Sequence, residues 1–468
     1  MKKTKIIATL GPASADKKTI LALARAGVNV FRLNFSHGDL NFFAGIIKNI
    51  KEIRTKYKIP LAILQDLQGP KIRIADLKVP VMVKTGEEIF LTEEKIQKTK
   101  IKSIQVDIKG MACCVHKGAK ILINDGMVQL RVKAADTKLK RVLCVVTAGG
   151  LIAGRKGVNL PGVDLPIPSI TSKDKKNLIF GLKQGVDIVC LSFVRTRKDM
   201  EDLRKFINKK KQAYPLLIAK IEKPEAVRRI KEILPVCDGI MVARGDLAVE
   251  AGFKNIPVMQ KHLITAANEA KKIVIVATQM LESMISNPFP GRAEITDVYN
   301  AVVDNADVLM LSGETSTGKY PVKTVETMSE IISKAEQEIK KQKQGLPAFR
   351  ETDEKIKNVL SYSCAAAANL IKNSLIMLHA VKLKDIEAVS DYRPYAEIAV
   401  FSGAEKIYNS LAFFHGILPV WARDKKEALA TVIKKNKKLE GVVYVDFYAS
   451  KNQAPYMEII RVNKNTIK

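Results

Sequence analysis

A chain of 468 residues that is 47% hydrophobic and 27% charged has the composition of a globular protein with about two to four domains. No stretch approaches the roughly 18 consecutive apolar residues of a membrane-spanning helix, so we expect no membrane partner. The formal charge of +30 admits a nucleic-acid partner, but the lysines are scattered and not interleaved with aromatic residues, so we expect no specific nucleic acid. The six cysteines lack metal spacing and indicate a reducing, cytoplasmic compartment.

Eight short apolar runs recur along the chain, with helix-like segments between them. The first follows two lysines, but its apolar part is shorter than the roughly 7–15 residues that a signal peptide needs. Helical periodicity marks intervening segments such as Met200–Ala213 and Pro257–Lys271. Eight strand–helix units predict a (β/α)8 barrel, with an open doubly wound sheet as the alternative. The runs cover residues 4–11, 28–35, 61–67, 186–193, 215–222, 239–244, 272–279 and 307–314.

Two regions depart from the barrel pattern. The first is strand-like and has turn signals such as Asp125-Gly126, which predicts a small inserted β domain. The second follows a charged linker near residues 340–355, and its alternating strand-like and helix-like segments predict a C-terminal α/β domain. The expected boundaries are 1–73 and 167–345 for the barrel, 74–166 for the insert, and 346–468 for the C-terminal domain.

Polar residues follow the apolar runs at their carboxyl ends, where a (β/α)8 barrel carries its chemistry. For any single one of them, a solvated strand end or a structural ion pair is the better explanation. Because they recur on five strands, we expect one anion-binding, metal-bearing pocket. In strand order they are Arg32, Asn34 and Ser36; Asp66, followed by Arg73; Lys220 and Glu222; Arg244 and Asp246; and Thr278 and Gln279.

The residue types in this set favour phosphoryl transfer. Glu222 and Asp246 offer hard oxygen ligands that suit Mg²⁺, an ion that keeps open positions for water and substrate oxygens. Lys220 beside such a metal indicates an anion that bridges the ammonium group and the metal. Arg32 adds a planar fork that matches phosphate geometry. The set is typical of a clamp that positions a phosphoryl group and neutralises its charge, and the chain has no glycine-rich Walker loop.

These residues stand in stretches that resemble the pyruvate kinase family over nearly the whole chain, among them "TKIIATLGPAS", "GVNVFRLNFSHG", "LQDLQGPKIR", "AKIEKPEA", "DGIMVARGDLAVE" and "LMLSGETSTGKYP". The resemblance implies a (β/α)8 barrel, an inserted small β-barrel lid domain and a C-terminal regulatory domain. It also implies the last step of glycolysis, in which Mg²⁺, or Mn²⁺ as an alternative ion, supports phosphoryl transfer from phosphoenolpyruvate to ADP. A homotetramer is implied as well, with residues 292–304 at one subunit interface.

The resemblance further assigns a role to each matching residue. It implies that Glu222 and Asp246 bind Mg²⁺, that Lys220 stabilises the transferring phosphoryl group and the enolate, and that Arg32 contacts phosphate. It implies that the backbone of Gly245 and Asp246, with Thr278, binds the substrate carboxylate, and that Thr278 lies close to the proton path to the enolate. It also implies that Arg73 and Lys156 contact the nucleotide phosphates, with His37 nearby.

The third strand departs from the pattern of the K⁺-dependent members of this family. Those members bind K⁺ at positions matching Asn34, Ser36, Asp66 and a threonine where this chain has Leu67. The joint change at Leu67, Gln68, Lys71 and Ile74 resembles the K⁺-independent class. We expect the ammonium group of Lys71 to replace K⁺, so that K⁺ is not required; the alternative is that Lys71 is one more surface lysine.

The C-terminal domain also departs from the family pattern. Residues 379–382 stand where the family carries a T-x-S-G loop for a phosphorylated effector, and residues 445–455 replace a second loop. These two segments have fewer small hydroxyl and glycine residues than the family's loops, so fewer N–H and O–H groups can donate hydrogen bonds to a phosphate. We therefore expect weak or absent control by fructose 1,6-bisphosphate, although Lys382 and Lys384 leave room for another anion.

Two other functions account for part of the pattern. A metal-dependent aldolase or lyase on the same barrel would use the paired carboxylates, but it would need neither the insert nor Lys156. A basic binding protein without activity would account for the charge, but not for intact Lys220, Glu222, Asp246 and Thr278.

Overall fold

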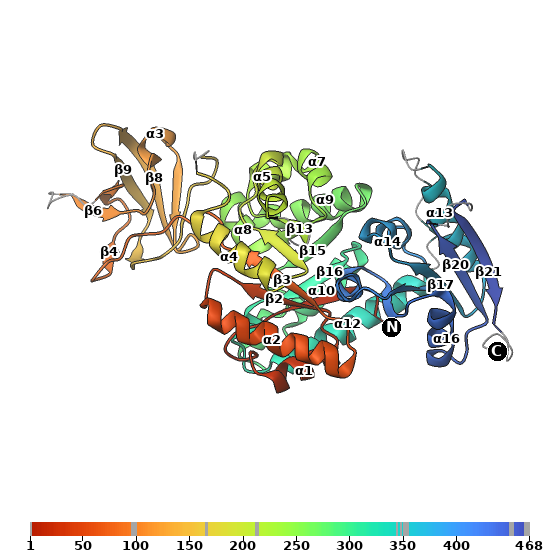
Figure 1. Ribbon diagram of the computed structural model, residues 1–468. Coiled ribbons are helices and arrows are strands. Elements are labelled where there is room, and N and C mark those ends of the chain that lie inside the picture. Colours follow the sequence, from red (N-terminus) through yellow and green to blue (C-terminus); the bar gives the residue numbers. More distant parts are fainter. Residues whose placement is uncertain are drawn as a thin grey trace.

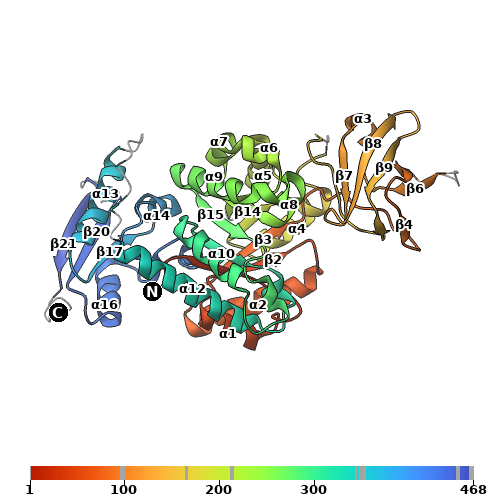
Figure 2. The same cartoon turned by 180° about the vertical axis from the view of Figure 1, so that it is seen from behind.

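The computed structural model describes residues 2–94, 101–163, 167–210, 215–342, 345, 346, 349, 355–448 and 454–462. It consists of three parts in a row: a sheet-rich insert, a central barrel and a C-terminal domain (Figure 1). The view from behind shows the barrel between the other two parts, so the insert and the C-terminal domain lie at opposite ends of the molecule (Figure 2).

Eight parallel strands close the central barrel in the order β1-β16-β15-β14-β13-β12-β3-β2. The eight apolar runs supply these strands, so the predicted (β/α)8 barrel is confirmed and the open doubly wound sheet is wrong. The strands are almost completely buried, as expected where helices cover a parallel sheet. Their bounds are β1 Lys5–Thr9, β2 Val30–Asn34, β3 Ala62–Leu67, β12 Ile188–Leu191, β13 Leu216–Ile221, β14 Gly239–Ala243, β15 Ile273–Ala277 and β16 Val308–Leu311.

Helices surround the barrel and have the capping chemistry that their sequences predict. The Asp16 side chain accepts a hydrogen bond from the Thr19 N–H at the start of α1, and Gly27 ends that helix at φ 119°. The predicted helix 200–213 begins earlier, at Arg197, and the predicted helix 257–271 runs from Ile256 to Glu269. The helices are α1 Lys17–Ala26, α2 Leu40–Tyr57, α4 Ser172–Lys183, α5 Arg197–Asn208, α6 Pro224–Arg228, α7 Ile230–Ile233, α8 Arg244–Ala251, α9 Ile256–Glu269, α10 Arg292–Val303, α11 Gly313–Ser316 and α12 Pro321–Lys341.

The insert follows β3 and is built from β-strands around its own core. A six-stranded sheet has the order β11-β7-β8-β9-β5-β6, and β10 pairs with β4 separately, so within the described residues hydrogen bonding does not close these strands into a ring. The predicted Asp125-Gly126 turn joins β7 to β8 with both residues at positive φ. The elements are β4 Val81–Val83, β5 Glu88–Thr92, β6 Lys102–Gln105, α3 Met111–Cys114, β7 Lys120–Ile123, β8 Val128–Asp136, β9 Arg141–Ala148, β10 Gly150–Ile152 and β11 Val158–Asn159.

The C-terminal domain has a five-stranded sheet in the order β19-β18-β17-β20-β21. The predicted alternation of strands and helices is present, and β21 adds an antiparallel strand at the edge of the sheet. The predicted linker lies largely outside the described residues, and α12 extends into its first part. The elements are α13 Lys355–Leu370, β17 Ser374–His379, α14 Leu383–Ser390, β18 Glu397–Ser402, α15 Glu405–Ser410, β19 Ile417–Trp421, α16 Lys425–Lys435, β20 Gly441–Asp446 and β21 Tyr456–Arg461.

One hydrophobic cluster joins the barrel to the C-terminal domain. It contains the first inward-facing residues of several barrel strands, such as Val30 and Leu216, together with Ile376 and Phe413 of the C-terminal domain. The C-terminal domain therefore packs against the amino-terminal end of the barrel and leaves the carboxyl end to the insert. No helix in the described part of the chain is both long and apolar enough to cross a membrane.

Candidate active site

Four charged side chains from three strands form a row at the carboxyl end of the barrel. Arg32 contacts Asp66 through Nε at 2.8 Å and through Nη2 at 2.7 Å. The ammonium group of Lys220 lies 3.5 Å from Asp66 and 2.9 Å from Glu222. Cations and carboxylates therefore alternate along the row, which partly offsets the desolvation cost of each charge.

The spacing of two residues on β13 produces the central contact of this row. Because alternate residues of a strand share a face, Lys220 and Glu222 point the same way, although Glu222 lies just beyond the end of the strand. The Lys220 side chain is 12% exposed, whereas those of Asp66 and Glu222 are 1% exposed. The ammonium group is thus the member of this trio most open to a ligand.

The carboxylates set the charge of Lys220. Burial acts to lower its pKa, but Asp66 and Glu222 outweigh burial and raise the pKa of Lys220 above its usual value. Burial likewise acts to raise the pKa of Asp66, but Lys220 and Arg32 hold it below its usual value. Lys220 and Asp66 are therefore both charged at neutral pH, and a cationic Lys220 is available to an anionic substrate.

Glu222 and Asp246 form a carboxylate pair beside this row. Burial raises the pKa of Glu222, and the neighbouring charge of Asp246 adds to that effect while Lys220 opposes it. The Phe193 N–H donates to Glu222 Oε2 at 2.6 Å, whereas within the described part of the chain the Asp246 carboxylate has no hydrogen-bond or ion-pair partner. The described residues contain no cluster of three or more His, Cys, Asp or Glu side chains suited to a metal. A divalent cation between these two carboxylates would keep open positions, as Mg²⁺ does.

Thr278 occupies a strained turn after β15. Thr278 and Gln279 have φ values of 70° and 53°, in the left-handed region that a β-branched residue rarely adopts. The Gly245 N–H donates to Thr278 Oγ1 at 2.9 Å, which ties this turn to the start of α8. The hydroxyl group of Thr278 is therefore fixed next to the backbone that precedes Asp246.

The structure corrects the place of Arg244, which the sequence analysis grouped with the anion pocket. Its guanidinium donates to the Thr278 carbonyl at 2.6 Å and pairs with Asp297 of α10 at 2.7 Å. It also donates to the Gln279 carbonyl at 3.2 Å. Arg244 thus holds the turn of Thr278 in place, with its guanidinium group engaged by Asp297 and by the carbonyls of that turn.

The residues predicted to contact the nucleotide lie where the insert joins the barrel. Arg73 forms an isolated β-bridge with Gly157, and the Ile74 N–H donates to the Lys156 carbonyl at 2.8 Å. Burial lowers the pKa of His37, and the charges of Arg73, Lys71, Arg32 and Lys173 lower it further, so cations gather around this imidazole. Among the described residues, neither Arg73 nor Lys156 has a hydrogen bond or ion pair with Lys220 or Glu222.

Of the positions expected to form or replace a K⁺ site, Asn34 and Asp66 are register partners on neighbouring strands β2 and β3. Asp66 belongs to the charged row, and Asn34 Oδ1 accepts the Ser36 N–H at 3.2 Å. The Leu67 side chain is buried in the barrel core and offers no oxygen. The Cε atom of Lys71 lies 3.5 Å from the position of a Cβ built on Gly157, so Lys71 packs on the segment that returns from the insert.

Three polar residues of the site were missed by the sequence analysis. Ser192, directly after β12, accepts from Lys220 at 2.9 Å and donates to the Leu67 carbonyl at 2.7 Å. The Thr9 hydroxyl accepts from Arg32 Nη1 at 3.0 Å. Glu250 of α8 accepts from Asn159 of the insert at 2.9 Å and from Lys223 at 3.0 Å. Thr9 and Ser192 could have been predicted, because each is a polar residue at the carboxyl end of a barrel strand, like the residues that the sequence analysis did select. Nothing in the sequence around Glu250 indicates a place in the site.

A closed (β/α)8 barrel with a carboxylate pair, a lysine and an arginine at its carboxyl end is suited to a metal-assisted phosphotransferase. Residues 1–325 match the family model described as pyruvate kinase, barrel domain. The chain therefore belongs to the pyruvate kinase family, whose members are phosphotransferases.

Curated relatives and a solved structure resemble most of the chain. Pyruvate kinase 2 of Synechocystis sp. is 39% identical over 426 residues, which are 90% of this chain and 71% of that protein. The pyruvate kinase of Thermococcus litoralis is 40% identical and matches 89% of this chain and 88% of that protein. The crystal structure of a pyruvate kinase from Cryptosporidium parvum aligns with a TM-score of 0.89 at 30% identity, covering 98% of this chain and 96% of that chain.

Proposed function

We propose that this chain transfers the phosphoryl group of phosphoenolpyruvate to ADP, giving pyruvate and ATP, in an Mg²⁺-dependent reaction. The observation that carries the proposal is the buried row of Arg32, Asp66, Lys220 and Glu222 beside Asp246. The test is a coupled assay of pyruvate formation from phosphoenolpyruvate, ADP and Mg²⁺. Turnover that is lost on chelation and restored by Mg²⁺ is expected, and absence of turnover with Mg²⁺ present would contradict the proposal.

Lys220 has the central role in the proposed reaction. Its ammonium group is charged and held between two carboxylates and the Ser192 hydroxyl, so little reorganisation is needed when negative charge develops nearby. It stabilises the phosphoryl group in flight and the enolate oxygen left behind, while Arg32 contacts the phosphate. Glu222 and Asp246 would hold Mg²⁺, which supplies positive charge to the substrate oxygens when bound.

The start of α8 and the turn of Thr278 are proposed to hold the substrate carboxylate. The N–H groups of Gly245 and Asp246 lie at a helix N-terminus, which favours an anion. The Thr278 hydroxyl, fixed by the Gly245 N–H, lies close to the path of the proton that converts the enolate into pyruvate. Arg244 supports this arrangement from behind through the Thr278 carbonyl.

The nucleotide is proposed to bind Arg73 and Lys156, with His37 nearby. Arg73 and Lys156 lie at the two chain segments that connect the insert to the barrel. A lid role for residues 74–166 is supported by this position, because movement of the insert would carry the cations toward the phosphates and exclude water.

The enzyme is proposed to work without K⁺. The Leu67 side chain offers no ligand oxygen, and Asp66 Oδ2 already accepts a hydrogen bond from Arg32. The ammonium group of Lys71 supplies the replacement charge in this proposal. Activity in a K⁺-free tetramethylammonium buffer should equal that with KCl. Activation of more than about tenfold by KCl would contradict this.

Weak or absent control by fructose 1,6-bisphosphate is also proposed. The His379 ring stacks on Phe401 with centroids 4.8 Å apart, and Lys382 lies over the Tyr448 ring at 5.5 Å. The Tyr448 hydroxyl donates to Asp385 at 3.1 Å, so side chains fill part of the region in which the family binds its effector. A large shift of the phosphoenolpyruvate saturation curve by this sugar phosphate would contradict the proposal.

A homotetramer is proposed from family membership and from exposed apolar side chains near α10. Phe253, Val258 and Phe289 are 74%, 73% and 72% exposed, and Ile295 of α10 is 39% exposed. Exposed apolar groups of this size favour burial against another subunit. Light scattering after size-exclusion chromatography should give four times the mass of 51.8 kDa, and a monomer at micromolar concentration would contradict the proposal.

A further inference from the structure

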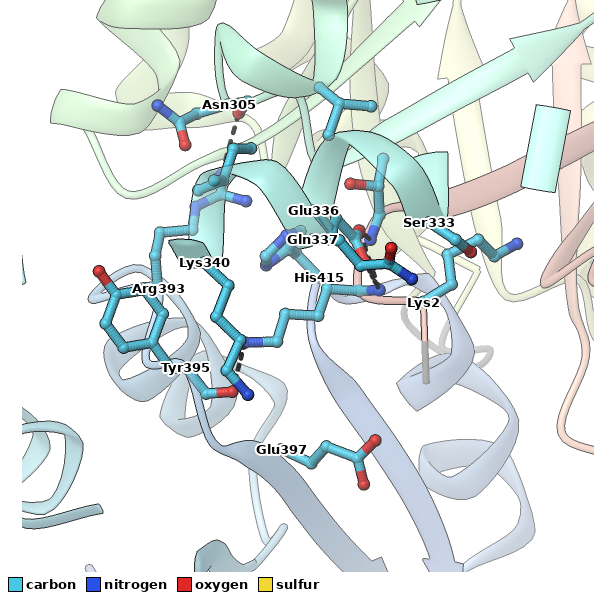
Figure 3. A pocket seen from close by; sticks show the side chains of 14 residues that line it. Lys2, Asn305, Ser333, Glu336, Gln337, Lys340, Arg393, Tyr395, Glu397 and His415 are labelled. Carbon is cyan, nitrogen blue, oxygen red and sulfur yellow. Dashed lines mark hydrogen bonds between the residues drawn. The ribbon is translucent and has the colours of Figure 1, made fainter. Parts of the chain in front are cut away.

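A cavity of about 420 Å³ lies where the amino-terminal segment, α12 and the C-terminal domain meet (Figure 3). Lys2, Lys3 and Thr4, which precede β1, form one wall, and α12 forms a second. The third wall comes from the C-terminal domain. Because it adjoins the start of β1, the cavity lies at the amino-terminal end of the barrel, away from the candidate active site. The α12 wall contains Ser333, Glu336, Gln337, Ile339 and Lys340, and the C-terminal wall contains Arg393, Tyr395, Glu397 and His415.

Positive side chains outnumber negative ones in the walls. Lys2, Lys3 and Lys340 line the cavity, against Glu336 and Glu397, while the lining residue Arg393 is paired with Asp307 at 2.7 Å. The Glu336 carboxylate is occupied by the backbone, because it accepts the N–H of Lys3 at 2.9 Å and the N–H of Thr4 at 2.6 Å. It is therefore only partly available to neutralise the lysines.

The lysine ammonium groups are held by carbonyl oxygens. Lys3 Nζ donates to the carbonyls of Pro394 and Tyr395 at 2.5 and 2.9 Å, and Lys2 Nζ donates to the Gly27 carbonyl at 2.7 Å. Within the described residues, no carboxylate lies at ion-pair distance from Lys2, Lys3 or Lys340. A carbonyl satisfies a hydrogen bond but brings no opposite charge, so the cavity keeps an excess of positive charge.

Titration behaviour agrees with this geometry. Burial lowers the pKa of Lys2 to about 7, with Lys5 lowering it further and Glu336 opposing. Burial lowers the pKa of Lys3 and of Lys5 to about 8. Around Lys3 and Lys5 the charged groups are Glu336, Glu397, Lys340 and Arg393, and burial with the nearby cations keeps the pKa of His415 well below its usual value. These lysines lack the anion that would restore their usual pKa.

We propose that this cavity binds a small molecule with a phosphate-monoester head group, held by Lys2, Lys3 and Lys340. A phosphate monoester carries close to two negative charges at neutral pH and offers three acceptor oxygens, which matches several ammonium groups without carboxylate partners. The volume exceeds that of a phosphate ion and falls within the range of pockets for small metabolites.

Binding would strengthen the junction between the barrel and the C-terminal domain. Lys3 already joins the two, because its side chain donates to residues 394 and 395 and its carbonyl accepts the Gly416 N–H at 3.0 Å. Lys5 adds a hydrogen bond to the Ile417 carbonyl at 2.8 Å. An anion beside these lysines would favour their charged form and with it these contacts. Ligand binding should therefore raise the thermal unfolding midpoint.

The probe for this site is sulfate, which stays doubly charged across the working pH range. Calorimetric titrations compare wild type with Lys2→Met/Lys340→Met and with the matched control Lys323→Met/Lys334→Met. The control removes two charges from α12 at positions whose side chains are 48% and 66% exposed. Sulfate binding at the candidate active site is common to all three proteins, so the difference between them reports on the cavity.

Wild type and control should bind one more sulfate per chain than Lys2→Met/Lys340→Met, or bind it at least tenfold more tightly. Lys2 and Lys3 are charged below their pKa values of about 7 and about 8 and neutral above them, so this extra binding should weaken at least tenfold between pH 6.5 and pH 9.5. Equal binding by all three proteins would overturn the proposal. If the double variant does not fold, Lys340→Met alone serves, because in the described structure this side chain has no hydrogen bond. Soaked crystals give a second readout: selenate in the cavity supports the proposal, and selenate confined to other sites overturns it.

Discussion

The two ends of the barrel both gather buried cations, but they neutralise them differently. At the carboxyl end, Lys220 lies between the carboxylates of Asp66 and Glu222. At the amino end, Lys3 and Lys5 face backbone carbonyls. The pKa of Lys220 is raised above its usual value despite burial, whereas burial lowers that of Lys5 to about 8. The partner, and not the depth of burial, decides the charge of a buried lysine.

This difference separates two kinds of site. A permanently charged lysine can stabilise negative charge at any moment of a reaction, which suits catalysis. A lysine whose charge depends on its surroundings responds to pH and to bound anions, which suits a site that senses a ligand. Four substitutions test how the two ends of the barrel and the base of the insert differ.

Replacing Lys220 by methionine should have the largest effect. Without its ammonium group, charge on the transferring phosphoryl group is not neutralised, and kcat should fall by about 10³-fold. Binding of phosphoenolpyruvate should change much less, because this contact acts mainly in the transition state. The measurements are steady-state kinetics and direct substrate binding. The control is Lys223→Met, whose ammonium group pairs with Glu250 and lies outside the row. A kcat within tenfold of wild type would contradict the central role of Lys220.

Replacing Asp66 by asparagine should lower stability by about 3 kcal/mol at pH 7, because Arg32 loses its carboxylate and Lys220 loses one of two. The pKa of Asp66 is depressed by folding, so its contribution is present above the unfolded value near 3.9 and is lost as pH falls through the folded value. Urea unfolding midpoints of wild type and variant should therefore converge in acid. A gap that widens below pH 4 would be inconsistent with this account.

Replacing Lys5 by methionine should act at the other end of the barrel, and in the opposite pH range. Folding lowers the pKa of Lys5 to about 8. Between about pH 8 and pH 10 the unfolded chain therefore binds more protons than the folded protein. The stability of the wild type should rise with pH over this range, by about 2 kcal/mol from this group. Lys5→Met should lack that rise. Unfolding midpoints measured at pH 7, 8, 9 and 10 check the slope, and an unchanged slope would show that Lys5 is charged in the folded protein.

Replacing Asn159 by alanine should have the smallest effect. The change removes one hydrogen bond to Glu250, worth about 1 kcal/mol, at the base of the insert. Because the insert carries Lys156, we expect the KM for ADP to rise about fivefold while the KM for phosphoenolpyruvate stays constant. An equal rise in both constants would indicate general damage to the site and not a change in how the insert is held.

Much of the candidate site was predictable because a barrel converts spacing along a strand into a shared direction. Lys220 and Glu222 lie two residues apart, and the structure brings their charges together. Arg244 broke the pattern, since it begins a helix and turns toward Asp297. Asp297 lies 53 residues from Arg244 in the sequence, so the residues around Arg244 give no indication of this ion pair. The cavity at the amino end was equally hidden, because its walls come from three segments whose apposition depends on domain packing.

The bridge between Arg73 and Gly157 has a mechanical consequence. The chain crosses between barrel and insert twice, and these crossings are hydrogen-bonded to each other next to the cations proposed to hold the nucleotide. A rotation of the insert must therefore displace those cations together with it. Nucleotide binding by these cations and closing of the insert are therefore coupled. Any substitution that stiffens this connection should change the affinity for the nucleotide and the rate of closing together.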